Sequence, residues 1–330
     1  MAAAGAASPK PATRRTAATV AAVDILAGFC SGINVTLVGH PLETIKVRLQ
    51  TQPSPPNHMY DGVVDCVRKT IKWEGPMGLY KGVGAPLGGQ LFFRSLLFGV
   101  YAKYLAVMTA PAAAGAPPRA LSYVEYGLGG SLAWGVGALV ECPLQVASSQ
   151  LQTQLLRVRA AEAAGLQPPE TYKGVVDYVR RAPAAFGLRA FYRGLGVHLA
   201  RNLPAGFMHF FWFEALRREY AKATGKPVTQ IGLLANMACG AVGGIFFWGT
   251  TFPIDAVKSA VQGDSLDPKL ARYSGAVDAA KKLWAEGGVA RFARGLDASL
   301  LRAVPANAAL LATASMVREA GYEYLDKPIE

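Results

Sequence analysis

Apolar residues along this chain form long stretches that prolines and glycines interrupt and that polar, basic connections separate. Six stretches are long enough to cross a bilayer as tilted helices, since a transmembrane helix needs about 20 mainly apolar residues. Single charges and prolines break each stretch, which is typical of helices that line a polar path. The predicted spans are residues 22–52, 84–108, 121–155, 196–221, 229–263 and 297–323.

Three short signatures recur in the same order three times. The first reads HPLETIKVRLQTQ at 40–52, CPLQVASSQLQTQ at 142–154 and FPIDAVKSAVQGD at 252–264. The second starts at Tyr60, Tyr172 and Tyr273, each followed two residues later by a glycine, and the third ends in Gly82, Gly194 and Gly295. Each repeat is expected to hold an apolar helix, a short amphipathic helix on the membrane surface, and a second apolar helix.

This periodicity predicts an all-α membrane protein with six tilted transmembrane helices in three pseudo-symmetric repeats. The expected boundaries are a disordered tail at 1–21 and repeats at 22–110, 121–226 and 229–325, which together form one transmembrane domain. The start of the chain is rich in Ala, Ser and Thr, with three bases and no acid before residue 23. It fits a transit peptide as well as a short disordered tail.

Composition supports a membrane protein, because 52% of residues are hydrophobic, 17% are charged and the mean hydropathy is +0.22. The net charge of +12 gathers in the connections after the first, third and fifth spans. Those connections are expected to face the negative compartment, which in a mitochondrion is the matrix. No nucleic-acid partner is expected. The four cysteines and four histidines lack metal-ligand spacing, and no nucleophile or phosphate loop is evident, so we expect no metal, no cofactor and no enzyme activity.

The first signature has an acid two residues after the proline and a base three residues further on, as in Pro41, Glu43 and Lys46. The proline recurs in all three repeats and both charges recur in the third, and this pattern resembles the mitochondrial carrier family over about residues 22–325. The string RAVPANAA at 302–309 is similar to the carnitine/acylcarnitine and basic amino acid branch. The resemblance implies a monomeric alternating-access transporter, working by exchange or uniport in the mitochondrial inner membrane, with plastid or peroxisomal membranes as alternatives.

In that family, the acid of one repeat pairs with the base of another to close the matrix side. By this rule Asp255 pairs fully with Lys46, Gln145 offers Lys258 only a hydrogen bond, and Glu43 faces the uncharged Ser148. Glutamines nine residues after each proline are expected to brace the ring. The predicted matrix gate consists of Glu43, Lys46, Gln145, Asp255, Lys258, Gln50, Gln152 and Gln262.

The resemblance also implies a cytosolic gate and lipid sites. The gate residues are Glu214, Arg217 and Arg318, with a pair between Glu214 and Arg318. Glycines at helix starts, beside bases, are expected to bind the phosphates of cardiolipin or another anionic lipid, because free backbone N–H groups and the helix dipole attract anions. These glycines are Gly62, Gly82, Gly174, Gly194, Gly275 and Gly295.

The substrate site is expected in mid-membrane, where charged side chains default to function. The resemblance implies that its residues are Gly89, Gln90, Arg94, Arg201, Asn202, Arg302 and Asn307. Three arginines, without an acid after Arg201, favour a carboxylate-bearing solute. A carnitine or basic amino acid carrier is the alternative, and an uncoupling-type leak or a non-transporting scaffold is less favoured. His198 and His209 lie on the same predicted helix as Arg201. They serve either in packing or in proton coupling.

Overall fold

The computed structural model describes residues 16–54, 58–111 and 119–326, apart from some side chains within the helices. The contacts between residues divide the chain into two units. One unit comprises Met1–Gly39 with Arg302–Glu330, and the other comprises His40–Leu301. Throughout the described residues the regular structure is helical, without a strand, so the predicted all-α fold is confirmed.

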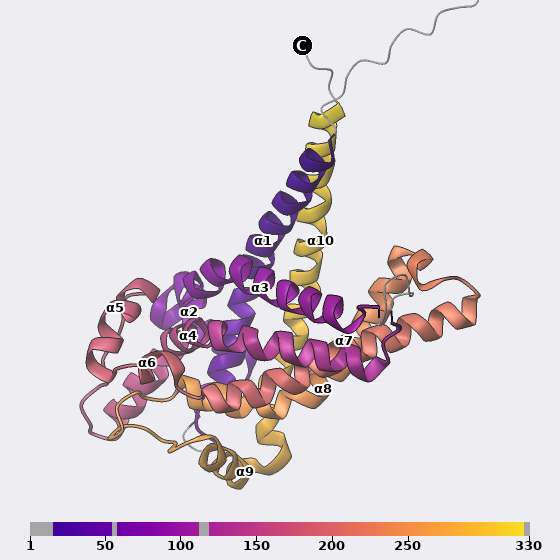
Figure 1. The fold of residues 1–330 in the computed structure, drawn as a ribbon. Helices are drawn as coiled ribbons and strands as arrows, with labels where there is room; N and C mark the ends of the chain where they lie inside the picture. The colour runs from indigo at the N-terminus through magenta and orange to yellow at the C-terminus, as the bar shows by residue number, and fades with distance from the viewer. Residues whose placement is uncertain (1–15, 55–57, 112–118, 327–330) are drawn as a thin grey trace, which may run out of the picture. The chain divides into compact units, whose positions relative to one another are not determined.

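Six long helices lie in the described part of the chain, at the six predicted places (Figure 1). They are α1 (Ala17–Thr51), α3 (Gly84–Met108), α4 (Tyr123–Ala163), α7 (Leu195–Thr224), α8 (Leu233–Gly263) and α10 (Leu296–Asp326). The connections hold the shorter helices α2 (Val63–Glu74), α5 (Val175–Phe186), α6 (Arg189–Tyr192) and α9 (Ala276–Phe292), with 3-10 turns η1 (Pro76–Tyr80) and η2 (Val228–Gln230).

Helix α1 begins at Ala17, inside the stretch that the sequence assigned to a disordered tail. The reason is a local cap: the Thr16 hydroxyl accepts from the Thr19 backbone N–H at 3.2 Å, and the Thr19 hydroxyl accepts from the Thr16 N–H at 2.8 Å. Such reciprocal bonds satisfy N–H groups that a helix start leaves open. The tail prediction is therefore wrong for 17–21, and residues 1–15 lie outside the described part.

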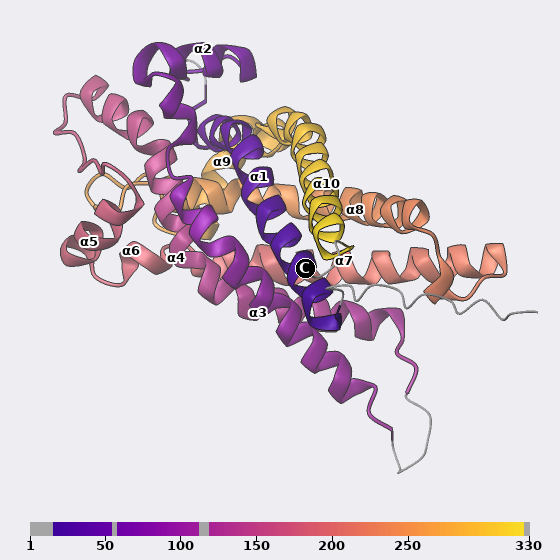
Figure 2. The ribbon, with the colours of Figure 1, turned by 90° about the horizontal axis from the view of Figure 1, so that it is seen from above.

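Within the unit of residues 40–301, α4 packs along α3, α7 and α8, and α7 packs along α8 (Figures 1 and 2). Glycines permit the closest approach. A Cβ at Gly130 of α4 would lie 2.4 Å from the carbonyl oxygen of Gly206 on α7. Small residues at such a crossing let helix backbones touch in a membrane. The polar residues further along α4, α7 and α8 are thereby brought together.

Each amphipathic helix covers a small apolar core that holds the tyrosine of its repeat. The core under α2 contains Tyr60 and Cys66, that under α5 contains Tyr172 and Tyr178, and that under α9 contains Tyr273. The first long helix of the same repeat, α1, α4 or α8, supplies further residues to each core. These three cores anchor the surface helices to the long helices.

The other unit consists of the first part of α1 and most of α10, which run antiparallel side by side (Figure 1). The Asn34 amide donates to the Thr313 hydroxyl at 2.6 Å. The Arg318 guanidinium pairs with Asp24 at 2.8 Å, and the Tyr322 hydroxyl bonds the same carboxylate oxygen at 3.2 Å. Contacts between polar side chains therefore hold these two segments together.

Among the described residues, two helical stretches are long and apolar enough to cross a membrane, Ala22–Thr51 and Leu296–Asp326. The other long helices carry charges within their length, such as Glu141 on α4, Arg201 on α7 and Asp255 on α8. Charges within membrane-spanning helices usually face a polar interior between the helices.

Candidate functional site

A buried ion pair joins α1 to α8 at the positions that the proline signature predicts. The Lys46 ammonium lies 2.6 Å from Asp255 Oδ2, and the two side chains are 4% and 3% exposed. A pair this short and this buried is a strong charge-assisted contact that holds the two helices together. The expected pair is present in the structure.

Arg201 on α7 extends this pair into a chain of polar contacts. Its Nε lies 3.5 Å from the other Asp255 oxygen, Oδ1, and its Nη1 donates to the Asn202 Oδ1 at 2.7 Å. One carboxylate therefore serves two cations, Lys46 and Arg201. The residue expected to bind substrate is directly linked to the residue expected to close the gate.

A second acid, Glu141 on α4, lies at the far end of the same chain of contacts. His198 Nε2 is 3.6 Å from Glu141 Oε2 and 3.2 Å from the Asn202 amide nitrogen. His198 is 1% exposed and Asn202 is fully buried. The network thus runs from Lys46 through Asp255, Arg201, Asn202 and His198 to Glu141.

This network corrects the expectation that the arginines meet no acid. Sequence reasoning missed Glu141 because it looked for the acid directly after Arg201, on α7, whereas the acid comes from α4. A signal was available: Glu141 is the only charged residue between Glu125 and Arg157, immediately before the Cys142–Pro143 signature. An isolated acid in a span defaults to function.

The gate positions of the second repeat also differ from expectation. The Gln145 amide donates to Glu141 Oε1, one turn earlier on α4, at 3.0 Å, and its bond to Lys258 stays a prediction. Lys258, 8% exposed, interacts electrostatically with Asp255 and Glu141. Glu43 lies 3.7 Å from Lys46 on its own helix.

The three glutamines of the predicted brace are fully or almost fully buried. Gln152 of α4 donates to the Thr44 hydroxyl of α1 at 3.5 Å, and Gln262 of α8 donates to the Cys142 sulfur of α4 at 3.8 Å. Each of these two links one repeat to another. The Gln50 amide has no hydrogen-bond partner among the described residues.

The remaining predicted substrate positions divide into three groups. A Cβ at Gly89 would lie 2.3 Å from Leu144 Cδ1, so this glycine makes room for helix packing. Arg302 belongs to the other unit, where its side chain lies beside Gly39. The side chains of Gln90, Arg94 and Asn307 are outside the described residues.

The residues predicted for the cytosolic gate have partners on α7 or on α1. Glu214 accepts from Arg218 at 2.6 Å and lies 3.4 Å from Arg217, all on α7. Arg318 pairs with Asp24 within its own unit. Sequence reasoning named neither Arg218, which directly follows Arg217, nor Asp24, which lies near the start of the first span.

The six glycines predicted to bind lipid fall into two structural classes. Gly82, Gly194 and Gly295 have φ between 72° and 81° and pack on a neighbouring helix. A Cβ would lie 2.9 Å from the Ser148 carbonyl oxygen at Gly82, and 3.1 Å from the Lys46 carbonyl oxygen at Gly295. By contrast, Gly62, Gly174 and Gly275 are extended, with open space where a Cβ would stand.

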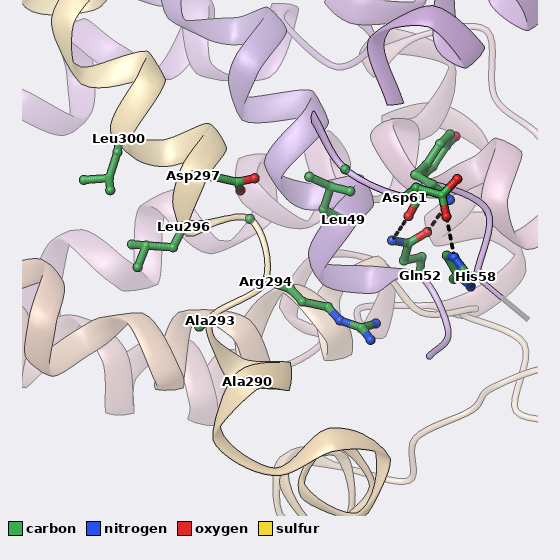
Figure 3. A pocket seen from close by; sticks show the side chains of 13 residues that line it. Leu49, Gln52, His58, Asp61, Ala290, Ala293, Arg294, Leu296, Asp297 and Leu300 are labelled. Carbon is green, nitrogen blue, oxygen red and sulfur yellow. Dashed lines mark hydrogen bonds and ion pairs between the residues drawn. The ribbon is translucent and has the colours of Figure 1, made fainter. Parts of the chain in front are cut away.

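Two of these glycines, Gly62 and Gly295, line a cavity of about 670 Å³ between the end of α1 and the start of α10 (Figure 3). The Arg294 guanidinium reaches the cavity and donates to the Pro53 carbonyl oxygen at 3.4 Å. Two acids also line it: Asp297, and Asp61, which pairs with His58 at 2.7 Å. The cavity therefore combines a base with two carboxylates.

The tyrosine signature closes onto the end of the preceding long helix in all three repeats. The backbone N–H of Tyr60 donates to Gln52 at 2.8 Å, that of Tyr172 to Gln154 at 3.1 Å, and that of Tyr273 to Asp264 at 3.0 Å. In the core beneath α2, burial raises the pKa of the Cys66 thiol to about 12. The thiol is therefore protonated and unreactive at neutral pH.

Comparisons with known proteins agree with the threefold pattern. The family described as mitochondrial carrier protein matches residues 18–111, 119–224 and 229–324. The human mitochondrial basic amino acids transporter is 36% identical over 299 residues, covering 90% of this chain and 89% of its own. A mitochondrial carnitine/acylcarnitine carrier-like protein of Arabidopsis thaliana is 33% identical, covering 89% and 97%. The mouse mitochondrial carnitine/acylcarnitine carrier protein is 33% identical, covering 87% and 90%.

Proposed function

Because the chain belongs to the mitochondrial carrier family, we propose that it carries basic amino acids, bound through their carboxylate and their cationic groups. It is a multi-pass protein of the mitochondrial inner membrane and a carrier of small metabolites, and its relatives are transporters. The proposal concerns the class of metabolite, the residues that bind it and the way in which the carrier opens and closes.

The observation that carries the proposal is the mixed charge around Arg201. A guanidinium fork suits a substrate carboxylate, and Asp255 and Glu141 suit ammonium or guanidinium groups. A dicarboxylate would meet two acids in this network, Asp255 and Glu141. The human relative at 36% identity is named for basic amino acids, which supports the same class.

A basic amino acid keeps the carboxylate that the sequence favoured and adds the cation that the sequence disfavoured. In the sequence, the neutral Asn202 directly after Arg201 disfavoured a cationic substrate. In the structure, Asn202 instead connects Arg201 to His198, which in turn contacts Glu141. We propose that Glu141 supplies the acid that the sequence lacks directly after Arg201.

We further propose alternating access, by exchange or uniport, with the pair of Lys46 and Asp255 closing the matrix side. Arg201 contacts the same carboxylate as Lys46, so a substrate that binds Arg201 is linked to that pair through Asp255. The glutamines Gln152 and Gln262 would brace this state through their links between repeats. Glu214, Arg217 and Arg318 remain the proposed residues of the cytosolic gate.

For the membrane partner, we propose cardiolipin or another anionic lipid at the helix-start glycines, around a monomeric carrier. Arg294 and the start of α10 at Gly295 favour a phosphate in the cavity of Figure 3. Asp61 and Asp297 disfavour it. The sites beside Gly82 and Gly194 are therefore expected to bind anionic lipid more tightly than this one.

The test is uptake into liposomes that contain the purified protein, with a panel of loaded and external solutes. Arginine and lysine should exchange faster than carnitine, malate or phosphate, and Arg201→Ala should abolish the exchange at an equal amount of inserted protein. Arg201→Lys is the matched variant, since it keeps the charge but loses the planar fork. Faster transport of dicarboxylates than of basic amino acids would overturn the proposal.

A further inference from the structure

The guanidinium of Arg201 lies between two aromatic rings from different helices. Its Cζ is 5.2 Å from the ring centre of Phe247 on α8 and 5.9 Å from that of Trp134 on α4. The two ring centres are 5.6 Å apart, with the rings inclined at 57°. The carboxylate of Asp255, 3.5 Å from Arg201 Nε, completes the surroundings. We call Trp134, Phe247 and Asp255 the cation box.

Two aromatic faces and a carboxylate are the groups that recognise alkylammonium and guanidinium ions. In this structure the cation inside the cation box is the guanidinium of Arg201, a residue of the protein itself. We propose that the cation box is the binding site for the cationic side-chain group of the substrate, and that Arg201 occupies it only until substrate arrives. This inference rests on the proposed function, since it requires a substrate with both a carboxylate and a cation.

The exchange of one cation for another preserves the charge balance of the site. When the Arg201 guanidinium turns to the substrate carboxylate, it gains a bidentate contact between opposite charges in place of a neutral bond to Asn202 at 2.7 Å. Asp255 keeps Lys46 at 2.6 Å meanwhile, so its charge stays compensated. The incoming substrate cation then restores the second positive charge beside Asp255. A neutral side chain could not do so.

The indole N–H of Trp134 gives independent support for a ligand in the cation box. Its indole Nε1 is buried and has no hydrogen-bond partner among the described residues. A buried Trp N–H usually finds a partner, and an unmet buried donor destabilises the protein. The cationic group in the box has only N–H donors, so the acceptor for this N–H would be the carboxylate of the same substrate. Simple packing between α4 and α8 would be served equally well by an apolar ring such as Phe.

The predicted determinant is the positive charge of the substrate side chain, so the test compares two inhibitors that differ in that charge. Arginine and citrulline share the amino acid group and the chain length, but the citrulline side chain is neutral. Each is titrated against uptake of labelled lysine into liposomes that hold the native protein, Trp134→Leu or Phe247→Leu. Trp134→Phe keeps an aromatic face, and Phe246→Leu alters the neighbouring ring, which stacks on Trp212 at 4.2 Å outside the box.

The expected result is that Trp134→Leu and Phe247→Leu each reduce the preference for arginine over citrulline by about fivefold, the factor that one cation–π contact supports. Trp134→Phe should retain most of the preference, and Phe246→Leu all of it. A preference unchanged in both leucine variants of the box, or changed equally in Phe246→Leu, overturns the inference. If Trp134→Leu does not insert, Phe247→Leu decides. If the native protein takes neither lysine nor arginine, the proposed function has failed instead.

Discussion

The two partners of the buried ion pair are expected to differ in importance, because Asp255 contacts two cations, Lys46 and Arg201. Asp255→Asn leaves Lys46 and Arg201 with their charges but without the carboxylate between them. Lys46→Met leaves Asp255 still paired with Arg201 at 3.5 Å. Loss of the acid should therefore destabilise the carrier more than loss of the base.

The distances give the size of the effect. At an effective dielectric near 20, opposite charges 3.5 Å apart attract by roughly 5 kcal/mol before desolvation is counted. Breaking a buried pair by removing one partner typically costs about 3–5 kcal/mol. Asp255→Asn should reach that range, and Lys46→Met about half of it, because Arg201 continues to compensate Asp255. For a chain of this size, about 1 kcal/mol shifts the melting temperature by roughly 2 °C.

The assay is thermal unfolding of the purified protein in one detergent at one heating rate, for the native protein, both single variants and the double variant. Asp255→Asn should lower the melting temperature by about 6–10 °C and Lys46→Met by about 3–5 °C. The double variant should be no less stable than Asp255→Asn, because it also removes the stranded ammonium. Equal losses in the single variants, or additive losses in the double variant, would refute the shared role of Asp255.

Three further outcomes are expected. Arg302→Ala should lower uptake at least about tenfold at an equal amount of inserted protein, since Arg302 is the repeat counterpart of Arg201; normal uptake would remove it from the substrate site. Gly82→Ala should lower the melting temperature by about 2–4 °C, because φ is 81° and a Cβ would meet the Ser148 carbonyl. Gly62→Ala should leave the melting temperature unchanged, since a Cβ there meets open space, and equal effects of the two substitutions would contradict this contrast. Burial raises the pKa of the Cys66 thiol to about 12, so Cys66 should react with maleimide only on unfolding, later than the half-buried Cys30. Fast labelling of Cys66 in the folded protein would show that the core under α2 opens.

Repetition made the fold predictable from the sequence. A single apolar stretch with a proline and a charge is ambiguous, but three copies of the same order of signatures constrain where each helix begins and ends. The contact between Lys46 and Asp255 followed from the same register, since both are signature residues. The start of α1 escaped prediction because it depends on two threonine side chains.

The substrate site was less predictable because its parts come from neighbouring helices. Glu141 was overlooked as a flanking residue of the signature, and its contact with His198 depends on how closely α4 and α7 approach at Gly130 and Gly206. Gly89 occupies a predicted contact position but is needed for packing against Leu144. Sequence register places residues along helices, whereas their partners depend on crossings that small residues control.

The most direct test of the central claim is competition for labelled arginine uptake into liposomes, by lysine and by malate, in the native protein and in Glu141→Gln. The account predicts that lysine blocks uptake by the native protein at concentrations where malate has no effect. It also predicts that Glu141→Gln weakens the lysine block at least about tenfold, because a neutral amide replaces the acid of the network. A stronger block by malate in the native protein, or an undiminished lysine block in Glu141→Gln, would contradict the account.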